Sequence, residues 1–181
     1  MSRADDPWVD AATMDDLDAV TELWVDLAQG QRQHGSTLLA AGNREAAREW
    51  VARSIVTGEL LVARSDCGPE LLGFVGFSLE RGEYDREHTR GVVSNLYVRP
   101  NRRGEGIGAA LLAAAEATLA DAGAETVALE ALIDNERARA FYARHGYEPA
   151  RIELRKSLAH GETHGIDGNE TDGDGTAGGN G

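Results

Sequence analysis

The sequence predicts an α+β fold, with one domain built on a mixed, mostly antiparallel central sheet flanked by about four helices. Segments with the alternation of a strand outnumber segments with helical spacing, and the early strands follow one another as hairpins. The chain then alternates strand, helix, strand and helix, an order that is typical of two strands connected by a helix. Its 181 residues are the length of one domain, and such a chain can bury a core without disulfides.

The first elements are a short strand and a helix. The strand is expected at Trp8–Ala12, and Thr13 with Asp16 has the spacing of an N-terminal cap pair. Apolar residues then recur at helical spacing, namely Leu17, Val20, Trp24 and Leu27. We expect this helix to end at Gly30, because glycine disfavours the helix interior.

The later elements follow from the same periodicities and from turn residues. They are a helix from Asn43 to near Gly58, strands at 59–64 and 71–79, a charged loop at 81–90, a strand at 92–98, an alanine-rich helix to about 122, a strand at 126–132, a helix at 136–145 and a last strand near 152–158. We therefore place the domain at residues 1–158. The glycine-rich, acidic remainder, 159–181, has too few apolar residues to fold and is expected to be a disordered tail.

The charge of the chain excludes some functions. The net charge is −13, and only one of the 18 basic residues is a lysine, a balance that favours a halophilic origin. The electrostatic field of such a negatively charged chain repels nucleic acid and therefore disfavours nucleic-acid binding. The sequence contains no apolar run long enough for a membrane span and no signal peptide, so we expect a cytoplasmic protein. The single Cys67 excludes a multi-cysteine metal site, and no metal is predicted.

The chemically informative segment follows the strand at 92–98. Pro100 ends the strand, three arginines lie within five residues around it (Arg99, Arg102 and Arg103), and three glycines open the next helix (Gly104, Gly106 and Gly108). Glycines let the backbone approach a ligand, and a helix N-terminus favours anions, so the loop suits a phosphate or diphosphate. A dinucleotide fingerprint ending at Ala109, with Glu130 as its ribose-binding acid, is a weaker reading of the same residues.

Two motifs in order resemble those of the GNAT superfamily of acetyl-CoA-dependent N-acetyltransferases. The first is Arg103-Gly-Glu-Gly-Ile-Gly108, which fits the family's phosphate loop at each fixed position. The second is Asn135-Glu-Arg-Ala-Arg-Ala-Phe-Tyr-Ala-Arg-His-Gly-Tyr147, at the expected distance. The resemblance covers about residues 8–158, and it implies a single GNAT-like domain.

The resemblance also implies roles for individual residues. The backbone of the phosphate loop would hold the diphosphate of acetyl-CoA through Arg103, Gly104, Glu105, Gly106, Ile107, Gly108 and Ala109. The strand backbone at Leu96, Tyr97 and Val98 would bind the pantetheine arm, and Asn135 would contact it further along. Tyr142 would protonate the departing thiolate, a task that suits a phenol; a core aromatic is the alternative.

The general base is less clear from the sequence. The strand before the loop reads Val93-Ser94-Asn95, where many relatives carry an acid. Glu130 matches a base position in members that resemble protein N-terminal acetyltransferases, and a structural ion pair is the alternative for it. His34 is a remote acceptor-site candidate.

The expected function is transfer of acetyl from acetyl-CoA to a primary amine by direct attack in a ternary complex. The acceptor stays open between a protein N-terminus and a small-molecule amine. The alternative is a non-catalytic acyl-CoA-binding or regulatory module on the same fold. A homodimer is possible, and neither nucleic acid nor a membrane is expected as a partner.

Overall fold

The computed structural model describes residues 8–66, 68–80 and 88–158. The chain divides into two units, of which the first ends at Glu148 and the second begins at Pro149. Within the described ranges, none of the helices combines the length and apolar character needed to cross a membrane.

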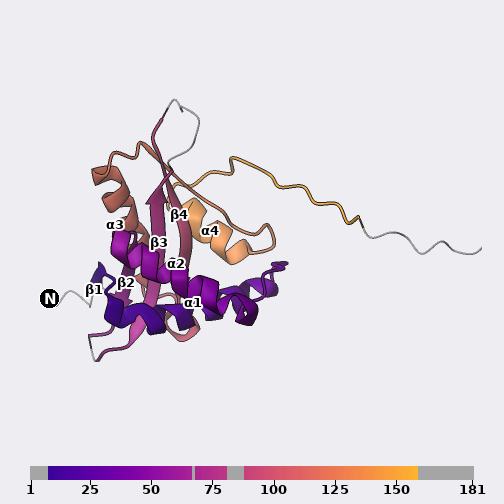
Figure 1. Ribbon diagram of the computed structural model, residues 1–181. Coiled ribbons are helices and arrows are strands. Elements are labelled where there is room, and N and C mark those ends of the chain that lie inside the picture. Colours follow the sequence, from indigo (N-terminus) through magenta and orange to yellow (C-terminus); the bar gives the residue numbers. More distant parts are fainter. Residues whose placement is uncertain (1–7, 67, 81–87, 159–181) are drawn as a thin grey trace, which may run out of the picture. The chain divides into compact units, whose positions relative to one another are not determined.

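A five-stranded sheet forms the centre of the first unit (Figure 1). Its strands are β1 (Trp8–Ala11), β2 (Leu60–Arg64), β3 (Leu71–Leu79), β4 (Arg90–Val98) and β5 (Thr126–Leu129), adjacent in that order. The first four pair antiparallel, and β5 joins β4 in parallel. The predicted mixed, mostly antiparallel sheet is confirmed.

Helices cover both faces of this sheet. They are α1 (Leu17–Arg32), α2 (Arg44–Thr57), α3 (Ile107–Asp121) and α4 (Glu136–Arg144). Helices α1 and α2 lie side by side over one face (Figure 1), and α3 packs on the other. The expected end of α1 at Gly30 was wrong, because the helix continues to Arg32. The cost of a glycine inside a helix, about 1 kcal/mol, is smaller than the packing that holds α1.

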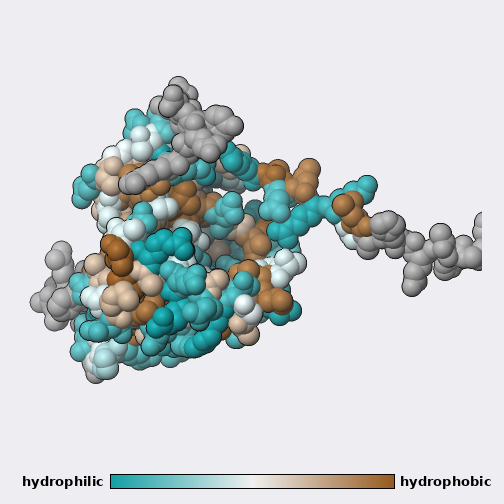
Figure 2. All heavy atoms as spheres, viewed as in Figure 1, coloured by the Kyte–Doolittle hydropathy of each residue, from teal (hydrophilic) through white to brown (hydrophobic). Residues whose placement is uncertain are grey.

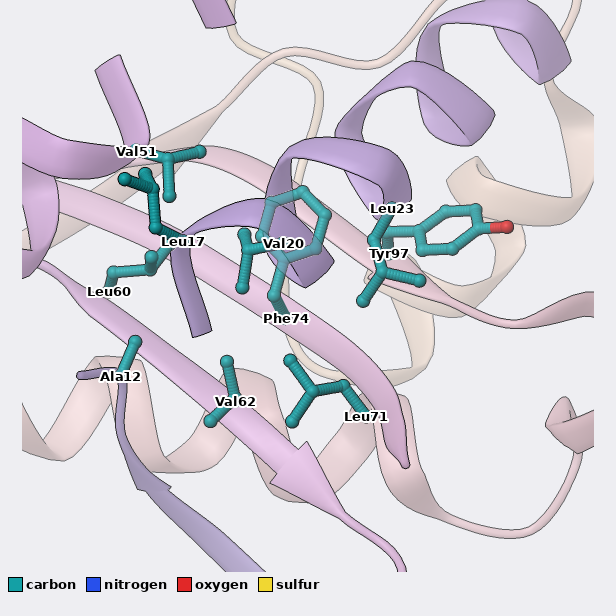
Figure 3. Packing of buried hydrophobic residues seen from close by; sticks show 10 residues of the cluster. All are labelled: Ala12, Leu17, Val20, Leu23, Val51, Leu60, Val62, Leu71, Phe74 and Tyr97. Carbon is teal, nitrogen blue, oxygen red and sulfur yellow. The ribbon is translucent and has the colours of Figure 1, made fainter. Parts of the chain in front are cut away.

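Two apolar cores result, one on each face. Side chains alternate along β3, so that Phe74 enters the core under α1 and α2 while Val75 enters the core under α3. Figure 3 shows the first of these cores, in which the ring of Tyr97 lies beside Leu23 and its hydroxyl points away from the cluster.

The expected last strand near 152–158 was wrong. Residues 149–158 have no regular secondary structure, and Ile152, Leu154 and Leu158 are exposed. Figure 2 shows apolar residues along this extended segment. An alternating pattern supplies the faces of a strand, but a strand also needs a neighbouring backbone with which to exchange hydrogen bonds.

One buried carboxylate ties the start of α1 to the sheet. Asp16 lies in the short 3-10 turn Met14–Asp16, is 7% exposed, and accepts hydrogen bonds from the backbone N–H (2.7 Å) and hydroxyl (3.0 Å) of Thr13. Two guanidinium nitrogens of Arg64 bind its two oxygens, each at 2.9 Å. Burial raises the pKa of Asp16, but the hydrogen bonds from Arg64 and Thr13 outweigh it and hold the pKa below the ordinary 3.8.

We expect Asp16→Asn to lower the free energy of unfolding by about 2–4 kcal/mol at neutral pH, because it removes the buried carboxylate that binds two nitrogens of Arg64 and leaves Arg64 only the longer contact with Asp10 at 3.7 Å. The folded pKa lies below the unfolded one, so this stabilisation is present above pH 3.8 and is lost as the pH falls through the folded pKa. Urea titrations across this pH range measure both effects. Asp15→Asn, a change at an exposed neighbour, is the control. Equal stability of Asp16→Asn and the wild type at neutral pH would contradict the assignment.

Candidate functional site

Strands β4 and β5 separate partway along β4. Pairing with β3 continues from Gly91 to Val98, whereas pairing with β5 ends where Val93 faces Leu129. The second half of β4 therefore has a sheet neighbour on one side only, among the residues that the structure describes. Its other edge presents backbone groups to an open gap.

The alternation of the ladder shows which residues face this gap. Arg99 N–H donates to Leu72 O at 2.9 Å, so these two residues form a hydrogen-bonded pair. Because such pairs alternate in an antiparallel ladder, the peptide groups of Leu96 and Val98 point away from β3 and toward the gap. Tyr97 forms a hydrogen-bonded pair with a residue of β3, so its peptide groups point toward β3 and not toward the gap. The sequence analysis had not distinguished Tyr97 from its two neighbours.

A β-bulge lies where the strands separate. Gly76 pairs with Asn95 and Phe77 pairs with Val93, so Ser94 is the extra residue. The Ser94 hydroxyl donates to Gly76 O at 3.1 Å. The bulge reverses the alternation, because Val93 enters the core under α3 while Tyr97 enters the core under α1 and α2. After the bulge, Leu96 and Val98 pack against the core under α3, so the alternation continues with its phase shifted by one residue.

The loop between β4 and α3 presents unpaired backbone donors. Gly104 (φ 90°) and Gly106 (φ 85°) have left-handed conformations, and α3 begins at Ile107, which is 2% exposed. The first helical hydrogen bond runs from Ala110 N–H to Gly106 O at 3.0 Å, and in the described part of the chain no backbone acceptor takes the N–H groups of residues 104–109. Such a run of free donors at a helix N-terminus fits a phosphate group.

The three arginines of this loop are not equivalent. Arg99 donates to Leu71 O at 2.8 Å and lies 3.4 Å from Glu70. Arg102 pairs with Glu105 at 2.9 Å. Arg103 donates to Val98 O at 3.0 Å, and its guanidinium lies 5.8 Å from the centre of the Tyr97 ring. As far as the structure describes the chain, Arg103 has no carboxylate partner and keeps its charge for a ligand.

Helix α4 places Tyr142 in an apolar cluster. Its ring centre lies 5.3 Å from that of Phe141 and 5.7 Å from that of Tyr147. Burial raises the pKa of Tyr142 to about 12, so the phenol stays protonated. The Tyr147 hydroxyl donates to Glu116 at 2.7 Å, whereas no protein group within the described ranges bonds to the Tyr142 hydroxyl.

Asn135 caps the N-terminus of α4. Its Oδ1 accepts the Ala138 N–H at 3.1 Å, which leaves the side-chain NH₂ available to a ligand. Further along α4, the ring of Phe141 lies 3.5 Å from the position that a Cβ at Gly108 would take. This contact joins α4 to the first turn of α3, so the two sequence motifs meet in space.

Glu130 follows β5 directly and is exposed. The expected strand 126–132 ends earlier, at Leu129. None of the ion pairs found between described residues includes Glu130. The loop after it approaches the loop after α1, since the Asp134 carboxylate lies 3.6 Å from the position of a Cβ at Gly35. His34 lies beside Gly35 and is partly buried; Cys67 is outside the described residues.

A cavity that the sequence analysis missed lies between α1, α2 and β4. It has a volume of about 280 Å³ and is lined by Trp24, Trp50, Asn95 and four further residues. Trp24 has the helical spacing of the apolar residues of α1, and Trp50 lies on α2. No local pattern shows that two such residues, 26 positions apart, flank one cavity.

Comparisons with known proteins agree with this geometry. Aminoalkylphosphonate N-acetyltransferase of Salmonella typhimurium is 27% identical over 149 residues, 81% of this chain and 88% of that protein. A GCN5-related N-acetyltransferase from Ralstonia eutropha JMP134 has a TM-score of 0.67 at 28% identity, covering 84% of this chain and 99% of that one. An aminoglycoside N-acetyltransferase in complex with CoA shares the fold, with a TM-score of 0.67 at 15% identity over 87% of this chain and 99% of that one.

The match to a family model is longer than either motif. Residues 17–147 match the acetyltransferase (GNAT) family, so the match includes both helices over the first sheet face, the phosphate loop and α4. Together with the N-acetyltransferase relative, it identifies an acyltransferase enzyme rather than a non-catalytic acyl-CoA-binding module. The chain belongs to the acetyltransferase (GNAT) family.

Proposed function

We propose that the protein transfers acetyl from acetyl-CoA to a primary amine by direct attack in a ternary complex. The observation that carries this proposal is the run of free N–H groups at residues 104–109, next to the open edge of β4. The names of two similar proteins support an amine acceptor, since one acts on aminoalkylphosphonates and another on aminoglycosides.

Binding of acetyl-CoA would use three parts of the site. The N–H groups of the loop and the charge of Arg103 fit the diphosphate, which carries negative oxygens suited to both. The peptide groups of Leu96 and Val98 fit the amide groups of the pantetheine arm, as an added strand would pair with the edge of β4. The NH₂ group of Asn135 offers one more donor at the start of α4.

The reaction needs one proton removed from the amine and one supplied to the sulfur. The amine nitrogen bonds to the acetyl carbon, the carbon–sulfur bond breaks, the amine loses a proton and the sulfur gains one. A thiol has a pKa near 8.5, well below the value of about 12 for Tyr142. Tyr142 therefore stabilises the developing thiolate chiefly by donating a hydrogen bond, and Glu130 serves as the base that accepts the amine proton.

Gly106→Ala tests the phosphate loop. A residue with a side chain at φ 85° is strained by roughly 1–2 kcal/mol, so we expect about a tenfold loss of affinity. At Gly108 a Cβ would make ordinary contacts, 3.5 Å from Phe141, so Gly108→Ala is the matched control and should bind normally. Calorimetric titration with desulfo-CoA measures both variants. Equal affinity of Gly106→Ala and the wild type would remove the loop from the site.

Tyr142→Phe should lower kcat by about 100-fold or more and leave desulfo-CoA affinity unchanged, because it removes only the hydroxyl that donates a hydrogen bond to the developing thiolate. Tyr147→Phe deletes a hydroxyl from the same cluster and is the matched control: it should keep kcat and lose about 1 kcal/mol of stability through its bond to Glu116.

The pH profile gives a second readout of the same role. A Tyr142 pKa of about 12 keeps the donor protonated through the alkaline range. The wild-type kcat should therefore not decrease with rising pH until the pH exceeds about 11. A falling limb near pH 10 that disappears in Tyr142→Phe would contradict the raised pKa.

Glu130→Gln tests the base. We expect the loss in kcat/KM to be larger for an alkylamine, with a pKa near 10, than for a peptide α-amine near 7.7–8.0, which arrives partly deprotonated. Thiol release from the two acceptors, measured at one pH, gives the comparison. A loss of the same size for both amines would remove Glu130 from proton transfer.

A further inference from the structure

The cavity between α1, α2 and β4 is walled mainly by apolar groups. Trp24 of α1 and Trp50 of α2 provide two indole rings, Leu38 and two alanines of α2 provide aliphatic surface, and Asn43 and Asn95 provide two amides. Within the part of the chain that the structure describes, no charged side chain lines it. At about 280 Å³ it is large enough for one aromatic ring, since an apolar cavity of about 150 Å³ already admits benzene.

The shape of this cavity depends on a glycine and on the bulge. A Cβ at Gly76 would lie only 2.5 Å from the ring of Trp50, so the absent side chain lets the indole lie directly against β3. The bulge at Ser94 brings Asn95 onto the same face, where it forms the part of the cavity wall contributed by β4. The contact with Gly76 fixes the indole of Trp50 in place before any ligand binds.

The cavity adjoins the gap proposed for the pantetheine arm. Asn95 lines the cavity, and the next residue, Leu96, directs its peptide group toward the gap between β4 and β5. One residue of a strand rises about 3.3 Å. A molecule held in the cavity can therefore place an attached amine at the edge of β4, near the acetyl group.

The nearby charges are engaged away from the cavity. On α2, Arg44 pairs with Glu22 and Arg48 pairs with Asp18 at 3.1 Å, which links the two helices. Among the described residues that line the cavity there is no arginine or lysine, so a phosphonate or carboxylate placed there would lose its water without gaining a counter-ion from them. An uncharged aromatic or branched aliphatic group has no such cost and gains contact with both indoles.

We propose that this cavity is the acceptor pocket and that it selects primary amines carrying an uncharged aromatic or branched aliphatic group, and excludes amines that carry an anionic group. The inference rests on the proposed acetyl transfer and adds its substrate class. It separates this chain from its aminoalkylphosphonate-acetylating relative. A small arylalkylamine and a peptide with an aromatic first residue share the required chemistry.

The first arm of the test compares acceptors on the full chain at saturating acetyl-CoA. Thiol release is measured with 2-phenylethylamine, a phenylalanine-initiated dipeptide amide, 2-aminoethylphosphonate and spermidine. We expect kcat/KM for 2-phenylethylamine or the dipeptide to exceed that for the phosphonate at least about 100-fold. If 2-phenylethylamine is the better acceptor of these two, the natural amine is a small molecule; if the dipeptide amide is better, it is a peptide N-terminus. Equal or better use of the phosphonate or of spermidine would overturn the inference and leave the acetyl transfer standing.

The second arm narrows the cavity without disturbing the core. Ala46 lines the cavity but is exposed to solvent, so Ala46→Leu adds bulk at its mouth on a helix that tolerates leucine. We expect KM for the apolar amine to rise about tenfold or more, with desulfo-CoA affinity unchanged. Ala117→Leu, the same change at an exposed position of α3, is the matched control and should leave KM unchanged. An unchanged KM in Ala46→Leu would overturn the assignment.

A binding measurement separates this inference from the transfer reaction itself. Titration of 2-phenylethanol, which lacks the amine, should change the fluorescence of the wild type, because two of its three tryptophans line the cavity. The affinity should fall in Ala46→Leu. Binding of this kind without acetylation of any amine would support the pocket and refute the proposed function. Acetylation of amines without such binding would support the proposed function and refute the pocket.

Discussion

The separation of β4 from β5 after Val93 is the constraint on which the site depends. The extra residue Ser94 occurs at the same point, and a bulge bends its strand and increases the local twist. If β5 stayed paired to Val98, the peptide group of Leu96 would be satisfied within the sheet and unavailable to a ligand. The separation thus replaces internal ladder hydrogen bonds with an edge that can bind another extended molecule.

The same bulge explains why both faces of one strand contribute. Val93 fills the core under α3 before Ser94, and after it Tyr97 fills the core under α1 and α2 while Leu96 and Val98 pack against the core under α3. The strand is therefore fixed from both sides close to the residues that would face substrates. Trp50 seated on Gly76, and Asp16 bound to Arg64, fix α2 and the start of α1 to the sheet in the same way. A site on such a scaffold loses little entropy when a ligand binds.

The sequence predicted the features that are local and missed those that arise from pairing. The loop from Arg103 to Gly108 was predictable because glycine and arginine encode backbone freedom and charge within six residues. The bulge at Ser94 is a register shift between two strands, and nothing in Val93-Ser94-Asn95 alone shows it. The unpaired segment at 152–158 has a strand's pattern without a strand's neighbour, so the pattern misled. The Trp24–Trp50 cavity needed the packing of two helices to be known.

The electrostatics of the site divide the work of binding two unlike substrates. A chain with net charge −13 repels anionic acetyl-CoA at long range, so in the proposed site the loop would hold it by short contacts from backbone N–H groups and from Arg103, which has no carboxylate partner in the described structure. The same net charge attracts protonated amines of every kind. Attraction alone cannot choose among them, and selection must come from the shape and apolar character of the place where the rest of the amine binds. The uncharged wall formed by Trp24, Trp50 and Asn95 is suited to that selection, because the charge of the chain concentrates amines and the cavity discriminates between them.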